Sequence, residues 1–200
     1  VASVDYHLAP EHKFPQAVDD AVNAGLWACD NAPAVGADPD KIVLAGDSAG
    51  ATLAAVVALA ARDAGRPHFL SQLLIYPATD LSMSHPSHQS FGDGYRLTRS
   101  LMLWSSANYL REGRDIMDPR ASPLIAGDHS GLPPAIIVTA EFDPLRDEGA
   151  AYASRLRDAG VDVQYRCFSG LIHGFINLTG AVESAKRALD EIAAMLKNHL

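Results

Sequence analysis

The chain has 200 residues, of which 48% are apolar and 20% are charged, a composition typical of a globular chain with one sizeable core. Against 24 Asp and Glu residues there are 16 Lys and Arg residues, and the formal net charge of −8 disfavours nucleic acid and anionic membranes as partners. The uncharged, Ala- and Val-rich run at 49–61 is too short to cross a bilayer and predicts a buried helix.

The two cysteines, Cys29 and Cys167, lie in no CxxC motif and have no histidine at metal-ligand spacing nearby. We therefore expect neither a zinc site nor a disulfide framework, and interpret both as reduced, structural thiols. Reduced thiols and the acidic composition favour a cytoplasmic location. The sequence begins without Met and without a secretory signal pattern, so we expect it to start within a domain.

Short β-branched runs alternate with longer Ala-rich stretches of helical spacing. In chain order they predict a strand at 2–6, a helix at 15–31, a strand at 41–45, a helix at 48–64, a strand at 70–76, a strand at 135–140, a helix at 147–159, a strand at 161–168 and a helix at 182–200. Several strands are apolar on both faces, as strands covered by helices on each side are. The alternation predicts a single α/β domain over 1–200, with a mostly parallel sheet and helices on both faces.

The sharpest motif is Gly46-Asp47-Ser48-Ala49-Gly50, between a predicted strand and a predicted helix. This is the context of a GxSxG nucleophile elbow, a strained turn in which the residues two before and two after the serine crowd each other unless both are small. We expect Ser48 to be a nucleophile and the backbone N–H of Ala49 to be an oxyanion donor at the helix N-terminus. The alternative is that Ser48 only caps the helix. We interpret Asp47 as structural, bound to nearby backbone.

The connection at 77–134 interrupts the alternation of strands and helices. It is rich in Ser, His, Pro and Gly, and only one helix is predicted in it, at about 100–110. Insertions of this length in compact domains are typically lids or binding loops. The alternative is a solvated excursion with one helix packed on the rim of the domain.

A serine nucleophile needs a base and a group that orients the base, and in this fold class the acid comes before the histidine along the chain. Asp143 follows the predicted strand at 135–140, at the sheet edge where sites in open α/β sheets gather. We choose Asp143 as the acid, with Glu141 and Asp147 as alternatives. Asp143 is also compatible with a purely capping role before Pro144.

The base is predicted to be His173, because it follows the strand at 161–168 in a loop whose glycines let the backbone turn. The other seven histidines precede the nucleophile (His7, His12), precede the acid (His68, His85, His88, His129) or lie in the final helix (His199). A loop histidine is usually just exposed, but the order of serine, acid and histidine, each after its own strand, favours catalysis.

With these residues in place, the sequence resembles the hormone-sensitive-lipase-like esterases of the α/β-hydrolase superfamily. The resemblance is carried by the stretch from Asp5 to Glu11, the Gly-Asp-Ser-Ala-Gly elbow, the stretch from Asp143 to Gly149, and His173-Gly174-Phe175. It implies a carboxylic ester hydrolase for short- to medium-chain esters, acting through an acyl-enzyme with the triad Ser48, Asp143 and His173 and without metal or cofactor. It also implies that residues 77–134 form part of a cap over the acyl pocket, and that the edge strand at 161–168 mediates a homodimer.

One family feature is not found in these 200 residues. The family's His-Gly-Gly-Gly motif, which supplies the remaining oxyanion donors, does not occur in the sequence. By the family topology, a further strand belongs between the strand at 2–6 and the strand before Ser48, so we expect a gap in the sheet. We therefore expect the 200 residues to be part of a longer protein. By themselves they should fold poorly and catalyse weakly, since one lost oxyanion donor costs on the order of a hundredfold in rate.

Two other functions fit the same fold. One is a non-catalytic binding protein, as in the plant gibberellin receptors, although an intact His173 argues against it because a receptor needs no base. The other is a serine peptidase or amidase with the same triad. Covalent labelling of Ser48 by a fluorophosphonate, and comparison of amide with ester turnover, separate these possibilities.

Overall fold

The β-branched runs of the sequence form a parallel sheet in the computed structural model, which describes residues 1–66 and 69–200. Within these residues the sheet has four strands in the order β1 (Val43–Asp47), β2 (Ser71–Ile75), β3 (Ala135–Phe142) and β4 (Val163–Ile172). Every neighbouring pair is parallel. The predicted α/β fold with a mostly parallel sheet is confirmed, and each step along the sheet needs a crossover connection.

The Ala-rich stretches of the sequence form the long helices. These are α1 (Gln16–Asn31), α2 (Ala49–Asp63), α4 (Arg99–Tyr109), α5 (Arg146–Asp158) and α6 (Glu183–Lys197), and α3 (Ser87–Ser90) is a single short turn. The predicted boundaries of α1, α2 and α5 hold within one residue, and α2 is the buried helix that its run of Ala and Val indicated. None of the helices in the described ranges combines the length and apolar character needed to span a membrane.

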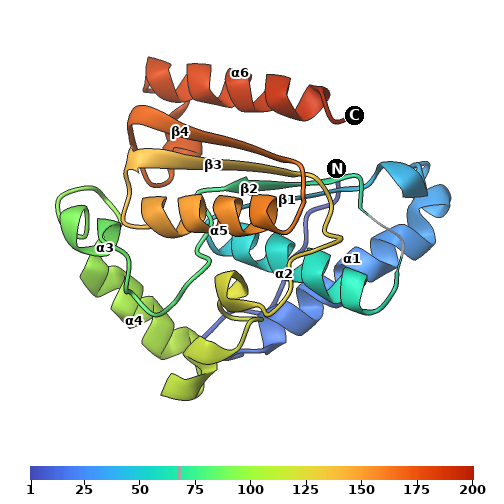
Figure 1. Cartoon of the computed structure of the whole chain (residues 1–200), viewed down its shortest axis with the longest axis horizontal. Coiled ribbons are helices and arrows are strands. Elements are labelled where there is room, and N and C mark those ends of the chain that lie inside the picture. The colour runs from blue at the N-terminus through green and yellow to red at the C-terminus, as the bar shows by residue number, and fades with distance from the viewer. Residues whose placement is uncertain (67–68) are drawn as a thin grey trace.

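Helices cover both faces of the sheet (Figure 1), with α2 and α5 on one face and α6 on the other. On the first face, Ala55 of α2 and Leu156 of α5 share an apolar cluster with Ile137 of β3. On the opposite face, Ile136 of β3 clusters with Ile192 of α6. Because alternate β3 residues feed the two clusters, this strand is apolar along most of its length.

Helix α1 packs on the outer side of α2 and completes a further layer (Figure 1). Val18 and Val57 belong to the cluster between the two helices. A Cβ atom on Gly25 would lie 2.7 Å from the Cγ1 atom of Val57, so glycine allows the two helices to approach closely. This packing holds α2, and with it the turn before its first residue, against the sheet.

The prediction of a strand at 2–6 is wrong. Residues 1–8 form no strand in the structure, and the side chains of Val4 and Leu8 are exposed. The expected gap in the sheet is therefore not observed, and β1 forms an edge of the sheet beside β2. A β-branched run adopts a strand only where a neighbouring strand pairs its N–H and C=O groups, and none of the described residues offers that pairing to 2–6.

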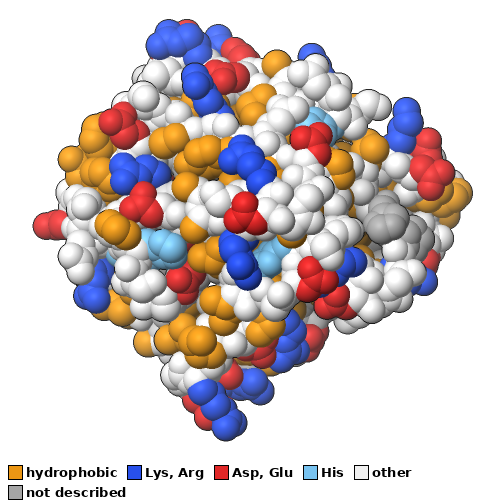
Figure 2. Space-filling model, in the orientation of Figure 1, with side chains coloured by type: hydrophobic (Ala, Val, Ile, Leu, Met, Phe, Trp, Pro, Cys, Tyr) orange, Lys and Arg blue, Asp and Glu red, His pale blue; other side chains and the backbone are white. Residues whose placement is uncertain are grey.

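The insertion at 77–134 contains α3, α4 and two short 3₁₀ turns at Gly113–Met117 and Pro123–Ile125. Its one predicted longer helix is confirmed as α4, although none of the α4 residues is buried. Figure 1 places α3 and α4 beside the carboxyl ends of the strands. In the space-filling view, side chains of both charge signs are scattered over the visible face with apolar atoms between them (Figure 2).

Candidate active site

Ser48 lies in a sharp turn between β1 and α2, with φ 53° and ψ −123°. This backbone conformation is strained for a residue other than glycine. The N–H of Ser48 donates to the carbonyl oxygen of Ile75 at 2.9 Å, which attaches the turn to β2. The Ser48 side chain makes no capping hydrogen bond to the helix, so the alternative of a simple N-cap is wrong.

The two glycines of the elbow have different surroundings. A Cβ atom on Gly46 would lie 2.3 Å from the carbonyl carbon and oxygen of Gly50, so only glycine fits at that position. Beyond the neighbouring backbone of its own helix, a Cβ atom on Gly50 would meet no atom of the described residues within 4 Å. The expectation that both positions must be small is therefore correct for Gly46 and wrong for Gly50.

The structure brings Ser48, Asp143 and His173 together at the carboxyl-end side of the sheet. The Nε2 atom of His173 lies 3.0 Å from the Oγ atom of Ser48, and its Nδ1 atom lies 2.8 Å from the Oδ2 atom of Asp143. Asp143 is fully buried, whereas 11% of the His173 side chain is exposed. With Nδ1–H donating to the carboxylate, Nε2 is left as an acceptor for the serine O–H.

Asp143 follows β3 and is held by two contacts at once. Its Oδ1 atom accepts a hydrogen bond from the N–H of Leu145 at 2.8 Å, while Oδ2 faces His173. The residue at the N-cap of α5 is Leu145, so the purely capping role of Asp143 is wrong. Because one oxygen is fixed by backbone, the other is directed toward the imidazole.

The geometry is that of an α/β-hydrolase, and a family model described as the alpha/beta hydrolase fold matches residues 1–177. The chain belongs to this family. The esterases among its relatives indicate that this α/β hydrolase belongs to the hormone-sensitive-lipase-like branch of the family. Its sequence motifs resemble the same branch.

Curated relatives of this α/β hydrolase include the carboxylic ester hydrolase LipN of Mycobacterium tuberculosis. LipN is 45% identical over 206 residues, a match that covers 100% of this chain and 55% of LipN. An arylesterase of Saccharolobus solfataricus is 43% identical over 199 residues, which cover 99% of this chain and 64% of the arylesterase. The chain thus spans between about half and two thirds of the length of these relatives.

The fold of this α/β hydrolase is also that of solved esterase structures. The crystal structure of EstE1, a thermophilic and thermostable carboxylesterase cloned from a metagenomic library, superimposes with a TM-score of 0.94 at 44% identity. The match covers 98% of this chain and 67% of EstE1. An esterase of Pyrobaculum calidifontis superimposes with a TM-score of 0.93 at 46% identity, over 97% of this chain and 64% of the esterase.

The alternative acids and the carboxylate beside the nucleophile have other partners. Glu141 accepts a hydrogen bond from the N–H of Gly170 at 2.8 Å, and Asp147 binds Arg146 at 2.8 Å. Asp47 was expected to bind nearby backbone, and this is wrong, because its Oδ2 atom accepts from the hydroxyl of Tyr76 at 3.1 Å. Only Asp143 among these carboxylates reaches His173.

The remaining histidines serve other contacts in the described part of the chain. Their partners are Asp20 for His7, the ring of His7 for His12, Asp80 for His85, Glu148 for His88, the carbonyl of Pro123 for His129 and Gln164 for His199. His68 lies outside the described residues. His173 is predicted to be the base because it follows a strand, and its position beside Ser48 agrees with that prediction.

A cavity of about 370 Å³ opens beside the nucleophile. Ser48 and Ala49 line it, and Ala49 is the first residue of α2, where a helix leaves N–H groups without intrahelical partners. Much of the remaining wall is apolar and includes Leu53, Leu81, Met83, Leu97, Met102, Trp104 and Leu145. A mostly apolar cavity with a serine hydroxyl and a helix N-terminus in its wall suits an uncharged organic substrate.

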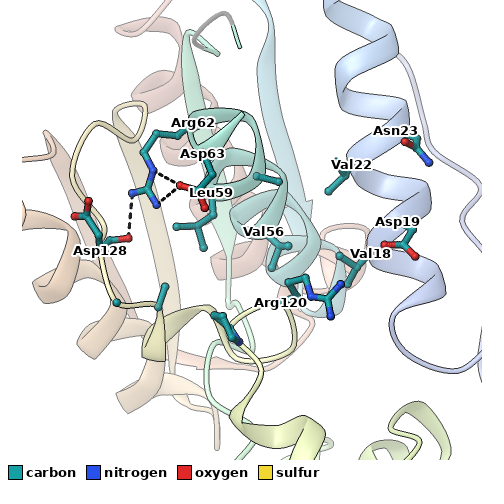
Figure 3. Close-up of a pocket in the computed structure, with 14 residues that line it drawn as sticks. Val18, Asp19, Val22, Asn23, Val56, Leu59, Arg62, Asp63, Arg120 and Asp128 are labelled. Atoms are coloured by element: carbon teal, nitrogen blue, oxygen red, sulfur yellow. Dashed lines mark hydrogen bonds and ion pairs between the residues drawn. The ribbon is translucent and has the colours of Figure 1, made fainter. Parts of the chain in front are cut away.

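A larger cavity, of about 780 Å³, lies between α1, α2 and the loop that ends the insertion (Figure 3). None of Ser48, Asp143 and His173 lines it. In its wall, Arg62 pairs with Asp63 and donates to the carbonyl oxygen of Asp128 at 3.0 Å. Size alone does not make this cavity the site of chemistry.

Sequence reasoning missed one residue beside the three. Tyr76 follows β2, and its ring centroid lies 4.6 Å from that of His173. The position of Tyr76 in the sequence could have indicated it, because Tyr76 ends a predicted strand. Ser48 and Asp143 likewise follow the ends of predicted strands. Within the residues that the structure describes, no cluster of three or more His, Cys, Asp or Glu side chains is arranged to hold a metal ion.

Proposed function

We propose that the protein is a serine hydrolase of carboxylic esters. The observation that carries the proposal is the unbroken series of contacts from Asp143 to His173 to Ser48, at 2.8 Å and 3.0 Å. The relatives named as a carboxylic ester hydrolase and as an arylesterase support the same reaction. In this proposal Ser48 is the nucleophile, His173 is the general base and acid, and Asp143 orients the imidazole.

The reaction follows in two halves. The Oγ atom of Ser48 attacks the ester carbonyl carbon while its proton passes to Nε2 of His173, and the resulting oxyanion accepts a hydrogen bond from the N–H of Ala49. The tetrahedral intermediate then collapses, and the bond between its carbon and the alcohol oxygen breaks. The imidazolium of His173 gives its proton to the leaving alcohol, and the acyl group remains as an ester on Ser48. Water then attacks that ester by the same route, releasing a carboxylic acid and restoring the serine.

The cavity supports small substrates with apolar acyl groups. Its volume of about 370 Å³ is near the lower end for ligand pockets, and apolar side chains dominate its walls. We therefore assign short- to medium-chain esters as substrates. A series of p-nitrophenyl esters from acetate to dodecanoate tests this, and a rate that keeps rising toward dodecanoate would contradict it.

Residues 77–134 act as part of a cap in this proposal. They supply Leu81, Met83, Leu97 and Met102 to the wall of the cavity that Ser48 and Ala49 also line. A segment that both lines the cavity and lies outside the sheet is suited to shaping the acyl pocket. Met102→Trp should shorten the preferred acyl chain, whereas an unchanged preference would argue against the cap.

The decisive experiment compares two serines that line the same cavity. Ser48→Ala should abolish hydrolysis of p-nitrophenyl butyrate and covalent labelling by a fluorophosphonate, whereas Ser105→Ala should retain both. Retained hydrolysis in Ser48→Ala refutes the proposal. A wild-type protein that binds esters without labelling would be a binding protein, and faster turnover of a matched amide would identify an amidase.

We also propose that the protein is a cytoplasmic homodimer formed through β4. This strand is at an edge of the sheet, where its outer N–H and C=O groups are open to pairing with a second copy. The free thiols Cys29 and Cys167 support the reducing compartment. Light scattering of the purified protein and cell fractionation test the two parts, and a monomeric mass or an exported protein would contradict them.

A further inference from the structure

Tyr76 occupies an unusual position between the elbow and the histidine loop. It is fully buried, and its φ of 38° is rare for a residue other than glycine. Its N–H donates to the carbonyl oxygen of Val138 at 2.7 Å, which fixes the backbone there against β3. A strained backbone that the surrounding contacts hold in place is commonly found at functional sites.

The side chain of Tyr76 connects two residues of the site. Its hydroxyl donates to the Oδ2 atom of Asp47 at 3.1 Å, and Asp47 directly precedes the nucleophile. Its ring lies beside the imidazole of His173, with centroids 4.6 Å apart and an interplanar angle of 57°. Phe175 packs against the same ring at 5.3 Å, so the phenol is held from several sides.

The direction of the hydrogen bond is fixed by the surroundings. Burial and the nearby Asp47 carboxylate raise the pKa of Tyr76, so the phenol stays protonated and donates. Asp47 accepts this bond and takes no part in the contacts of His173 with Asp143 and Ser48. Asp47 therefore acts on the imidazole indirectly, by holding the ring of Tyr76 that lies beside it.

We propose that Tyr76 and Asp47 are positioning residues for His173, a role that rests on the proposed ester hydrolysis. Asp47 holds the phenol, and the ring keeps the imidazole on the line between Asp143 and Ser48. The same ring stabilises the imidazolium that forms in each half-reaction, because a cation within about 6 Å of an aromatic ring is attracted to it. Tyr76 does not line the substrate cavity, so its contribution is to kcat and not to substrate binding.

A buried tyrosine with a hydrogen bond is often only part of the core, and the pH profile separates the two roles. Charged and titratable groups near Tyr76 and His173 are Asp47, Asp143 and Arg96, whose guanidinium donates to the carbonyl oxygen of Gly174 at 3.0 Å. Variants at Tyr76 leave Asp143 and Arg96 in place. A change in the acidic limb of kcat/KM between these variants then reports the ring beside the imidazole.

The experiment begins with wild type and Ser48→Ala, which must differ in hydrolysis of p-nitrophenyl butyrate for the proposed function to stand. Tyr76→Leu should then lower kcat about tenfold with KM nearly unchanged, and should lower the apparent pKa of the acidic limb, because the imidazolium loses its ring. Tyr76→Phe keeps the ring and should lose only about fivefold in kcat.

Variants of the partner test the hydrogen bond itself. Asp47→Asn keeps an acceptor oxygen and should stay within about twofold of wild type, whereas Asp47→Leu should match Tyr76→Phe. The double variant Tyr76→Phe with Asp47→Leu should be no worse than either single variant, since all three lack the same bond. Full additivity would overturn the pairing of the two residues.

Tyr152 provides a matched control. It is also fully buried, but it lies in the core cluster on the other face of the sheet, and its hydroxyl has no partner among the described residues. Tyr152→Leu should lower Tm and leave the acidic limb of kcat/KM unchanged. If Tyr76→Leu behaves like Tyr152→Leu, the positioning role is overturned while ester hydrolysis stands. If Tyr76→Leu does not fold, Tyr76→Phe and the Asp47 variants decide the question.

Discussion

The imidazole Nε2 atom of His88 lies 2.7 Å from the Oε2 atom of Glu148, and both side chains are buried. His88 accepts a hydrogen bond at Nδ1 from the N–H of His85, so its proton is on Nε2 and points at the carboxylate. The other carboxylate oxygen accepts from the N–H of Thr79 at 2.6 Å. Glu148, near the start of α5, therefore binds both Thr79 and His88. It joins the beginning of residues 77–134 to the helix that follows Asp143.

Removing one partner of this buried pair should destabilise the fold. His88→Leu leaves a carboxylate oxygen of Glu148 buried without its donor, and we expect the free energy of unfolding to fall by about 3 kcal/mol. Urea denaturation measures the loss. The matched control is Glu183→Gln, which breaks the exposed pair of Glu183 and Arg187 on α6 and should change stability little. Equal effects of both variants would contradict a structural role for the buried pair.

The choice of acid can be tested by replacing each carboxylate in turn. Asp143→Asn should lower kcat by about 10⁴-fold with the fold intact, because the amide no longer holds the imidazole in the tautomer that accepts the serine proton. Asp147→Asn should cost far less, since Asp147 contacts Arg146 and the N–H of Ser87 and not His173. Steady-state kinetics with circular dichroism as the folding control checks both, and a reversed order would reassign the acid.

The two glycines of the elbow should differ in their tolerance of a methyl group. Gly46→Ala places a Cβ atom 2.3 Å from the backbone of Gly50, so the turn cannot form and the folded yield should collapse. Gly50→Ala adds its Cβ inside a helix, where no described atom beyond the helix's own neighbouring backbone lies within 4 Å. We expect a stability equal to wild type or up to about 1 kcal/mol higher. Thermal denaturation distinguishes these outcomes, and equal losses would mean that something else crowds Gly50.

His129 should make stability depend on pH. Its Nε2 atom donates to the carbonyl oxygen of Pro123 at 3.0 Å, and burial lowers its pKa below the ordinary 6.5. The unfolded chain then binds the proton more readily than the folded chain, so the free energy of unfolding falls as the pH drops below about 6.5, until the folded pKa is passed. His129→Gln keeps a donor but does not titrate, and urea denaturation between about pH 7.5 and 5 should give it a shallower decline. Parallel curves for the two proteins would contradict this assignment.

Local patterns in the sequence were sufficient to predict the parallel sheet, the long helices and the order of Ser48, Asp143 and His173. They succeed because propensity and periodicity act over a few residues, and because a parallel sheet brings the carboxyl ends of its strands to one edge. Each of the three residues follows its own strand, so that edge could be inferred before any distance was known.

The tertiary structure decided everything that depends on a partner distant in the chain. The run at 2–6 has the pattern of a strand but none to pair with among the described residues, and the hydroxyl of Tyr76, not nearby backbone, binds Asp47. His173 lies 125 residues from Ser48 in sequence and 3.0 Å from it in space. Such contacts arise from how strands and helices pack. The sequence indicates which residues are suited to a role, whereas the packing of the fold decides which residue each of them contacts.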